Sequence, residues 1–314
     1  MKVSFCQESN IRCRRKKILN FIIISIIFFN PFSCSVKNTV LLKLHSGAIL
    51  IGEWQKNILR GEAFQMEIRP VKADNKKFLT PVKKAMQKYN MLEPGDRIAV
   101  GLSGGKDSST LFYILTLLQK QLPLEFDLVP ITLALGFDDM DISPLEKFVN
   151  DLGSRLHIKP TQIGRIVFDV RNEKNPCSLC ANLRRGALYN TAKSLGCNKA
   201  ALGHHLDDAI ETLLMNLVFS GRLGVFHPKS YLDRRDITVI RPMIFLEEKT
   251  IGKIVKSRNI PVIENTCPAN KNTKREEMKM LVDRLSRQYP DIRYKFLHAI
   301  QSVNPDDFWN KRYF

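Results

Sequence analysis

From about residue 98 onward the chain alternates between two kinds of hydrophobic pattern. Short runs rich in Val, Ile and Leu predict buried strands at residues 98–102, 128–135, 158–163, 200–204 and 238–241. Between them, segments with apolar residues at helical spacing begin near Ser108, Pro144, Cys177 and Asp207. This alternation predicts an α/β fold, a parallel sheet with helices on both faces. Such sheets bind ligands at the carboxyl ends of their strands.

The segments that flank this core have different patterns. Residues 81–92 predict a short amphipathic helix. Residues 36–75 carry no recognisable motif, and from residue 247 the pattern is helical and basic. We therefore expect an N-terminal extension (1–65), an α/β domain (66–246) and a helical C-terminal region (247–314).

The extension contains an apolar run at residues 18–29 behind a cluster of Arg and Lys. A basic flank followed by about 12 apolar residues is typical of a signal peptide. The run is short for a membrane span, which needs about 20 apolar residues. Because the downstream motifs require nucleotide and reduced thiols, we expect a cytoplasmic protein with an atypical or wrongly assigned start. A membrane tether is the alternative.

The composition adds a strong positive charge. The 314 residues include 49 Lys and Arg against 31 Asp and Glu, a net charge of +18. This excess favours a polyanionic partner such as nucleic acid, although a solvated basic surface would give the same count. The 7 cysteines are too few for a disulfide scaffold in a chain of this length.

The loop after the first predicted strand, "SGGKDS" at residues 103–108, has the character of a phosphate site. Its glycines permit positive φ and a close approach to the backbone. The helix that follows presents unpaired N–H groups and a partial positive charge. The loop is not a Walker A motif, because Val100 stands where the first glycine of that motif belongs. For Asp107 and Ser108, simple helix capping is the alternative role.

Two further clusters carry chemistry. Cys177 and Cys180 lie in the first turn of a predicted helix, where we expect lowered thiol pKa values. From the residues alone this pair is a redox dithiol, half of a zinc site or part of an iron–sulfur site. Cys267 lies on a basic loop, whereas Cys197 is expected to be a buried small hydrophobe.

The second cluster is "GHHLDDAIET", in which a predicted strand ends at Gly203 and His204. Asp207 and Asp208 then open a helix, and Glu211 shares a face with Asp208. Paired carboxylates beside a phosphate loop predict a magnesium site. Helix capping is again the alternative.

In this order the motifs resemble those of one enzyme family. "SGGKDS" is similar to the PP-loop of ATP pyrophosphatases, which have an adenine nucleotide alpha-hydrolase-like fold. With "CSLCANLRRG", "GHHLDDAIET", "VIRPM" and the late Cys267, it resembles the tRNA 2-thiocytidine synthetase (TtcA-type) family over residues 75–300. Members adenylate a cytosine in the tRNA anticodon loop with ATP and replace its 2-oxygen by sulfur.

The resemblance implies an AMP-forming tRNA sulfurtransferase that uses ATP, Mg²⁺ and a 4Fe–4S cluster. The implied cofactor-binding residues are Ser103, Gly104, Gly105, Lys106, Asp107, Ser108, Gly203 and His204. The implied catalytic residues are Asp107, Arg184, Asp207 and Asp208, and the implied cluster ligands are Cys177, Cys180 and Cys267. The implied partners are tRNA and a sulfur donor, either a cysteine desulfurase or sulfide, and a homodimer is left open.

One position departs from the family pattern, and other activities stay open. Ala134 stands where we expect an acidic residue. A tRNA 2-thiouridine synthetase shares the chemistry but usually carries extra zinc-binding cysteine pairs, and a lysidine synthetase lacks the cluster cysteines. A nucleotide-binding RNA-binding or redox protein would use the loop without adenylation. Thiolation of a small molecule would not explain the basic charge.

Overall fold

The computed structural model describes residues 74–136, 141–171, 176–263, 267 and 274–304. The chain divides into two units, Met1–Phe64 and Gln65–Phe314, and every described residue belongs to the second. The signal-like run at 18–29 lies outside the described residues. Among the helices that the structure does describe, none combines the length and the apolarity needed to cross a membrane.

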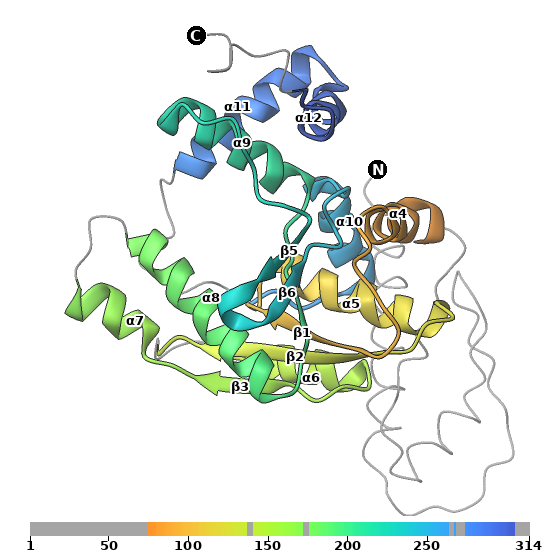
Figure 1. Ribbon diagram of the computed structural model, residues 1–314, viewed down its shortest axis with the longest axis vertical. Coiled ribbons are helices and arrows are strands. Elements are labelled where there is room, and N and C mark those ends of the chain that lie inside the picture. Colours follow the sequence, from red (N-terminus) through yellow and green to blue (C-terminus); the bar gives the residue numbers. More distant parts are fainter. Residues whose placement is uncertain (1–73, 137–140, 172–175, 264–266, 268–273, 305–314) are drawn as a thin grey trace, which may run out of the picture. The chain divides into compact units, whose positions relative to one another are not determined.

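Helices and strands alternate along the second unit (Figure 1). In chain order the elements are η1 (Asn75–Leu79), α4 (Thr80–Lys88), β1 (Asp96–Leu102), α5 (Lys106–Gln121), β2 (Phe126–Ala134), α6 (Ser143–Asp151), β3 (His157–Pro160), α7 (Ile163–Arg165), η2 (Ile166–Val170), α8 (Pro176–Ser194), β4 (Lys199–Ala201), α9 (Leu206–Ser220), β5 (Lys229–Leu232), η3 (Asp233–Arg235), β6 (Ile237–Ile240), α10 (Glu248–Arg258), α11 (Lys274–Gln288) and α12 (Ile292–Gln301).

The strands form a 6-stranded sheet in the order β3-β2-β1-β4-β6-β5. The pairs β3–β2, β2–β1, β1–β4 and β4–β6 are parallel, which confirms the predicted α/β fold. β5 was not predicted, and it pairs antiparallel with β6. Its sequence is polar and short, and it reaches β6 through a tight hairpin in which Asp236 adopts a φ of 46°.

Two predicted strands end earlier than their apolar patterns do. β4 stops at Ala201, because the chain turns there into the loop that carries Gly203 and His205. β3 stops at Pro160, and a helical turn begins at Ile163. The predicted helix starts agree with the observed starts of α5, α6, α8 and α9 to within two residues.

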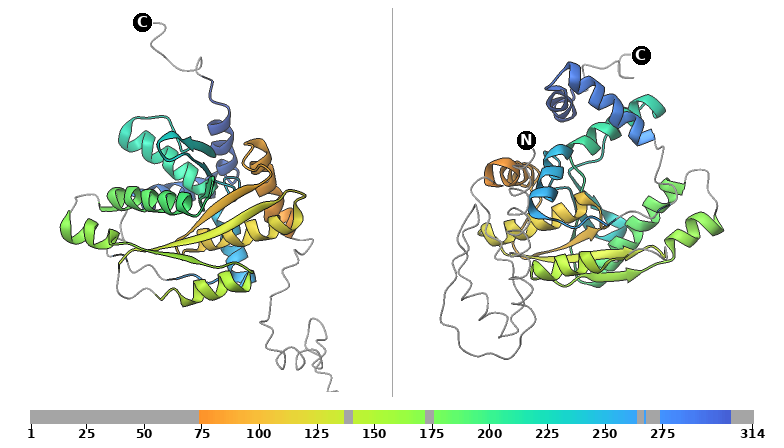
Figure 2. Two further views of the ribbon diagram at one scale, coloured as in Figure 1. Left: turned by 60° about the horizontal axis from the view of Figure 1, so that its bottom comes forward. Right: turned by 180° about the vertical axis from the view of Figure 1, so that it is seen from behind.

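Helices cover both faces of the sheet. Ile98 and Val100 of β1 join the larger core cluster with residues of α5, α6 and α10. The intervening Ala99 points to the other face and packs with α8. Figure 2 shows α8 and α6 on opposite sides of the strands. Because both faces are buried, the strands have continuous rather than alternating apolar sequences.

The helical C-terminal region packs onto the same unit. α10 lies against α5, and α11 and α12 lie against α9. Leu206 and Ile210 of α9 share a buried cluster with Met278 and Val282 of α11. This packing brings the charged residues of α11 and α12 to the carboxyl edge of the sheet, where the predicted site lies.

Candidate active site

The phosphate loop (residues 103–108) joins β1 to α5 and is closed by its own hydroxyl groups. Ser108 Oγ accepts from the Ser103 N–H at 3.1 Å and donates to the Gly105 carbonyl at 3.0 Å. Gly104 has a φ of 79°, and its carbonyl accepts from the Ile263 N–H at 2.9 Å. The loop therefore holds its shape without a ligand and presents the amino end of α5 to an anion.

A second loop, between β4 and α9, crosses the phosphate loop at very close range. A Cβ added to Gly203 would lie 3.0 Å from the carbonyl carbon of Asp107 and 3.0 Å from the nitrogen of Ser108. Backbone atoms cannot move aside as flexible side-chain tips can, so only glycine fits this position. The close approach places the residues that follow Gly203 beside the phosphate loop.

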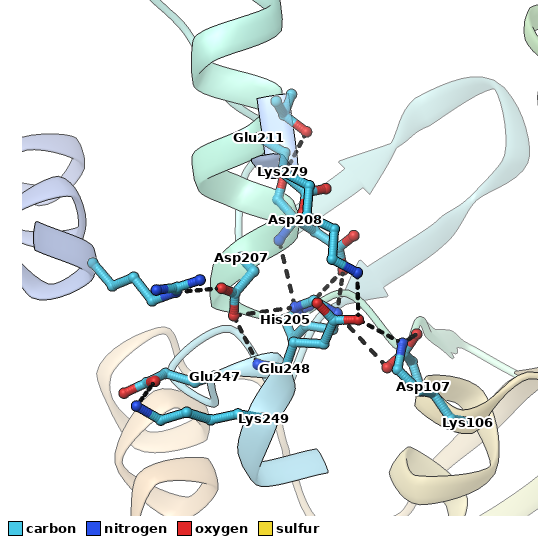
Figure 3. A network of polar contacts seen from close by, with 12 residues as sticks. Lys106, Asp107, His205, Asp207, Asp208, Glu211, Glu247, Glu248, Lys249 and Lys279 are labelled. Carbon is cyan, nitrogen blue, oxygen red and sulfur yellow. Dashed lines mark hydrogen bonds and ion pairs between the residues drawn. The ribbon is translucent and has the colours of Figure 1, made fainter. Parts of the chain in front are cut away.

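His205 connects the two loops. It caps α9 through two hydrogen bonds. The imidazole Nδ1 accepts from the backbone N–H of Asp208 at 3.4 Å, and the backbone N–H of His205 donates to Asp208 Oδ2 at 3.0 Å. Its Nε2 lies 3.4 Å from Asp208 Oδ2 and 3.6 Å from Asp107 Oδ1 (Figure 3). Asp107 Oδ1 is buried without a hydrogen-bond partner among the described residues. Asp107 and Asp208 thus face one imidazole, with acceptor capacity left for a cation.

Asp207 has a different environment from its neighbour. Its Oδ1 accepts from Arg293 Nε of α12 at 2.6 Å, and its Oδ2 accepts from the Glu248 N–H at 2.7 Å. Both oxygens are engaged, and the residue is buried. In this arrangement Asp207 ties α9 to α10 and α12.

Lys106 is held by carboxylates at the start of α5. Its Nζ lies 3.2 Å from Asp107 Oδ2 and 3.0 Å from Glu248 Oε1, and Lys279 Nζ also lies 3.0 Å from Glu248 Oε1. Burial would raise the pKa of Glu248, but the hydrogen bonds from both lysines outweigh it and lower that pKa to about 2. Glu248 is therefore ionised, and Lys106 is paired in the absence of phosphate (Figure 3).

The acidic face of α9 is balanced by α11. Arg275 Nη1 lies 3.0 Å from Asp208 Oδ1, and Arg275 Nε lies 3.8 Å from Glu211 Oε2. Burial, and next the negative charge of Asp208, raise the pKa of Glu211 to about 7. Arg275 of α11 therefore reaches into the acidic site.

A hollow of about 430 Å³ adjoins this network. It is lined by Lys106, Asp207, Glu247, Glu248, Lys249, Gly252, Asp283 and Arg293. Its lining residues include three cationic and four carboxylate side chains.

The cysteine pair lies at the start of α8. Cys177 is exposed and Cys180 is half-buried. Burial raises the pKa of the Cys180 thiol, and the charges of Cys267 and Cys177 raise it further, while a hydrogen bond and the charge of Arg184 oppose the shift. The expectation of a lowered thiol pKa is therefore wrong for Cys180, because burial outweighs the effect of Arg184. Cys197 is buried in the core, as predicted.

The charges of Cys177 and Cys267 both act on the Cys180 thiol, so both residues lie within electrostatic range of it. Among the described residues, no three side chains of His, Cys, Asp or Glu already meet in metal-binding geometry. Three thiol groups near a cationic Arg184 nevertheless match the donor set of an iron–sulfur cluster, which takes soft thiolate ligands. The residues present therefore fit the cluster that the motifs imply.

The structure also places residues that sequence reasoning missed or left in doubt. His205, Glu248 and Arg293 all join the network around Asp107 and Asp207, but none had been singled out for the site. His204, which is expected at the nucleotide, packs its ring against Phe226 with the centroids 4.8 Å apart. The repeated "HH" was the only local signal for His205.

Comparisons with known proteins agree with this geometry. The model of the PP-loop domain family matches residues 74–285. The fold resembles the U34-tRNA thiolase NcsA from Methanococcus maripaludis with its [4Fe-4S] cluster, with a TM-score of 0.58 and 23% identity over 72% of this chain and 79% of that chain. The fold and the phosphate loop therefore define an ATP-binding protein of the PP-loop class.

Relatives of known name are closer in sequence. The tRNA-cytidine(32) 2-sulfurtransferase of Syntrophotalea carbinolica is 38% identical, over 71% of this chain and 87% of that protein. The enzyme of the same name from Pelobacter propionicus is 40% identical, over 71% of this chain and 84% of that protein. The one from Geobacter sulfurreducens is 37% identical, over 73% of this chain and 91% of that protein. The chain belongs to the tRNA-cytidine(32) 2-sulfurtransferase family.

The raised pKa of Glu211 predicts a specific pH dependence of stability. Its folded-state value of about 7 lies above the ordinary value of 4.5, so the folded protein holds this proton more tightly. The resulting stabilisation is complete below pH 4.5 and is lost as the pH rises through 7, by about 3 kcal/mol at most. Glu211→Gln should remove this loss, measured by urea unfolding at pH 5 and pH 8. The control is Glu277→Gln, on the exposed side of α11. An unchanged pH dependence in Glu211→Gln would contradict the prediction.

Proposed function

We propose that this protein is an ATP-dependent tRNA 2-thiolation enzyme that acts on cytidine 32. The observation that carries the proposal is the combination, in one chain, of the phosphate loop with a cysteine pair that lies near a third cysteine. A redox protein would need the thiols without the nucleotide loop, and a simple nucleotide-binding protein would need no cysteines. The names of the relatives supply the target base.

The first chemical step uses the phosphate loop. The O2 atom of cytosine attacks the α-phosphorus of ATP, and pyrophosphate leaves as the new O–P bond forms. Ser103, the N–H groups at the start of α5 and Lys106 would hold the pyrophosphate. Lys106 Nζ contacts Asp107 and Glu248, and a phosphate oxygen would accept from the third N–H of the ammonium group or replace Glu248.

Asp107 and Asp208 would hold Mg²⁺. Their carboxylates face the same His205 imidazole, and the unpartnered Oδ1 of Asp107 is a hard oxygen ligand of the kind that this ion prefers. His205 would fix the positions of the two carboxylates relative to each other. Asp207 would have a positioning role, because its two carboxylate oxygens already accept hydrogen bonds from Arg293 and from the Glu248 N–H.

The second step replaces the activated oxygen. A sulfur nucleophile at the oxidation state of sulfide attacks C2 of the adenylated cytosine. AMP leaves and carries the former O2 atom with it. A 4Fe–4S cluster held by Cys177, Cys180 and Cys267 would supply the sulfur. Arg184, which hydrogen-bonds Cys180, would offset the negative charge of the thiolates.

The product identifies the reaction. Protein incubated with an unmodified tRNA transcript, ATP, Mg²⁺ and sulfide should form 2-thiocytidine at position 32, detected by nucleoside mass spectrometry. Asp107→Ala should form neither AMP nor thionucleoside, whereas Asp127→Ala, at the opposite end of the sheet, should remain active. Formation of 2-thiouridine would contradict the choice of base, and no thionucleoside from cluster-containing protein would contradict tRNA thiolation.

Metal content tests the cysteine assignment independently of activity. Anaerobically purified protein should contain iron and acid-labile sulfide. Replacing any one of Cys177, Cys180 or Cys267 by Ala should abolish the iron–sulfur absorbance, because each thiolate would hold one iron. Cys197→Ala should retain it, since that thiol is buried in the core. Stoichiometric zinc without iron would overturn the assignment.

A further inference from the structure

Of the buried side-chain atoms without a hydrogen-bond partner in the described part of the chain, two belong to residues that pack against Phe226. They are Nε of Arg241 and Nδ1 of His204. Arg241 is only 9% exposed. Buried polar groups are nearly always hydrogen-bonded in folded proteins, and a cationic group has the most to lose. Two such atoms at neighbouring positions therefore point to a ligand that pairs with them.

Phe226 holds both side chains in place. The His204 ring lies 4.8 Å from the Phe226 ring, centroid to centroid, with an angle of 45° between the planes. The guanidinium carbon of Arg241 lies 4.9 Å from the same centroid, and Arg241 Nη1 donates to the His227 carbonyl at 2.6 Å. The guanidinium is thus fixed at one nitrogen, and its Nε–H remains as an oriented donor.

Arg241 and His204 have opposite hydrogen-bonding roles, one as a donor and the other as an acceptor. Burial, and next the positive charge of Arg241, lower the pKa of His204 to about 4, so its imidazole is neutral at physiological pH. A neutral ring with its proton on Nε2 offers Nδ1 as an acceptor. The titratable neighbours that shift the pKa of Arg241 are Tyr189 and Arg185 of α8, and neither is a carboxylate. One fixed donor and, in the tautomer protonated at Nε2, one acceptor therefore lie beside the same aromatic ring.

We propose that Arg241 and His204 read the target base, with Arg241 Nε–H donating to N3 of cytosine and His204 Nδ1 accepting from its exocyclic amino group. This inference rests on the proposed function. In cytosine N3 is an acceptor and the exocyclic group is a donor. In uracil both are reversed, because N3 carries a proton and the exocyclic atom is a carbonyl oxygen. The pair would therefore select cytosine and reject uracil.

The location suits an extruded base. His204 follows β4 and Arg241 follows β6, and β4 lies between β1 and β6 in the sheet. The phosphate loop that follows β1 is therefore beside the loop that carries His204, and α8, which carries Cys180, packs against β1 and β4. A base bound there could present O2 to ATP and C2 to the sulfur in turn, as the reaction requires.

The test compares two tRNA transcripts that are identical except at position 32, which is cytidine in one and uridine in the other. His204→Phe keeps a ring against Phe226 but loses the acceptor, and Arg241→Lys keeps the charge but loses the fixed Nε–H. Each variant should lose about ten- to a hundredfold in kcat/KM on the C32 transcript, the loss typical of one base-edge contact. The ratio of kcat/KM on C32 to kcat/KM on U32 (the C32/U32 ratio) should fall at least tenfold. The Kd values for ATP and for tRNA should stay within about twofold, since phosphate contacts dominate RNA affinity. Arg155→Gln, exposed at the amino end of β3, is the matched control.

The possible outcomes separate this site from the proposed function. Both variants folded, with wild-type C32/U32 ratios, would overturn the base-reading site while thiolation stands. A weakened ATP affinity in His204→Phe would also overturn it and would return His204 to the nucleotide. Wild-type protein that thiolates neither transcript would overturn the proposed function and the base-reading site together.

Discussion

The site depends on the close contact between two loops at the carboxyl edge of the sheet. Gly203 passes so near the backbone of Asp107 and Ser108 that no side chain fits there. Because β1 and β4 are adjacent parallel strands, the loops that follow them leave the sheet side by side. The glycine lets them touch, and His205 then faces both Asp107 and Asp208. The phosphate loop and the acidic start of α9 thus lie side by side.

The C-terminal helices make this concentration of charge stable. Arg275 and Lys279 of α11 and Arg293 of α12 neutralise carboxylates that would otherwise repel one another at short range. Lys106 is paired with Glu248 in the same network, so the lysine is already held in position. The region after residue 247 thus contributes side chains to the candidate site.

The sequence predicted the elements well, because strands buried on both faces leave long apolar runs and glycines mark the loops. It also indicated the phosphate loop and the acidic pair, whose residues are close together in the chain. It could not reveal Glu248 and Arg293, which reach Asp207 from 41 and 86 residues away. Nor could it show which histidine of the "HH" pair faces the carboxylates, or that burial raises the pKa of Cys180. Those properties arise only from tertiary packing.

The central claim is that the oxygen of the base is activated at the phosphate loop and leaves as part of AMP. The most direct measurement uses tRNA with ¹⁸O at O2 of cytidine 32 and follows the label by mass spectrometry during one turnover. Direct adenylation requires the label to appear in the phosphate group of AMP, in a one-to-one ratio with 2-thiocytidine. Unlabelled AMP, with the ¹⁸O released to water or kept in the RNA, would contradict the claim.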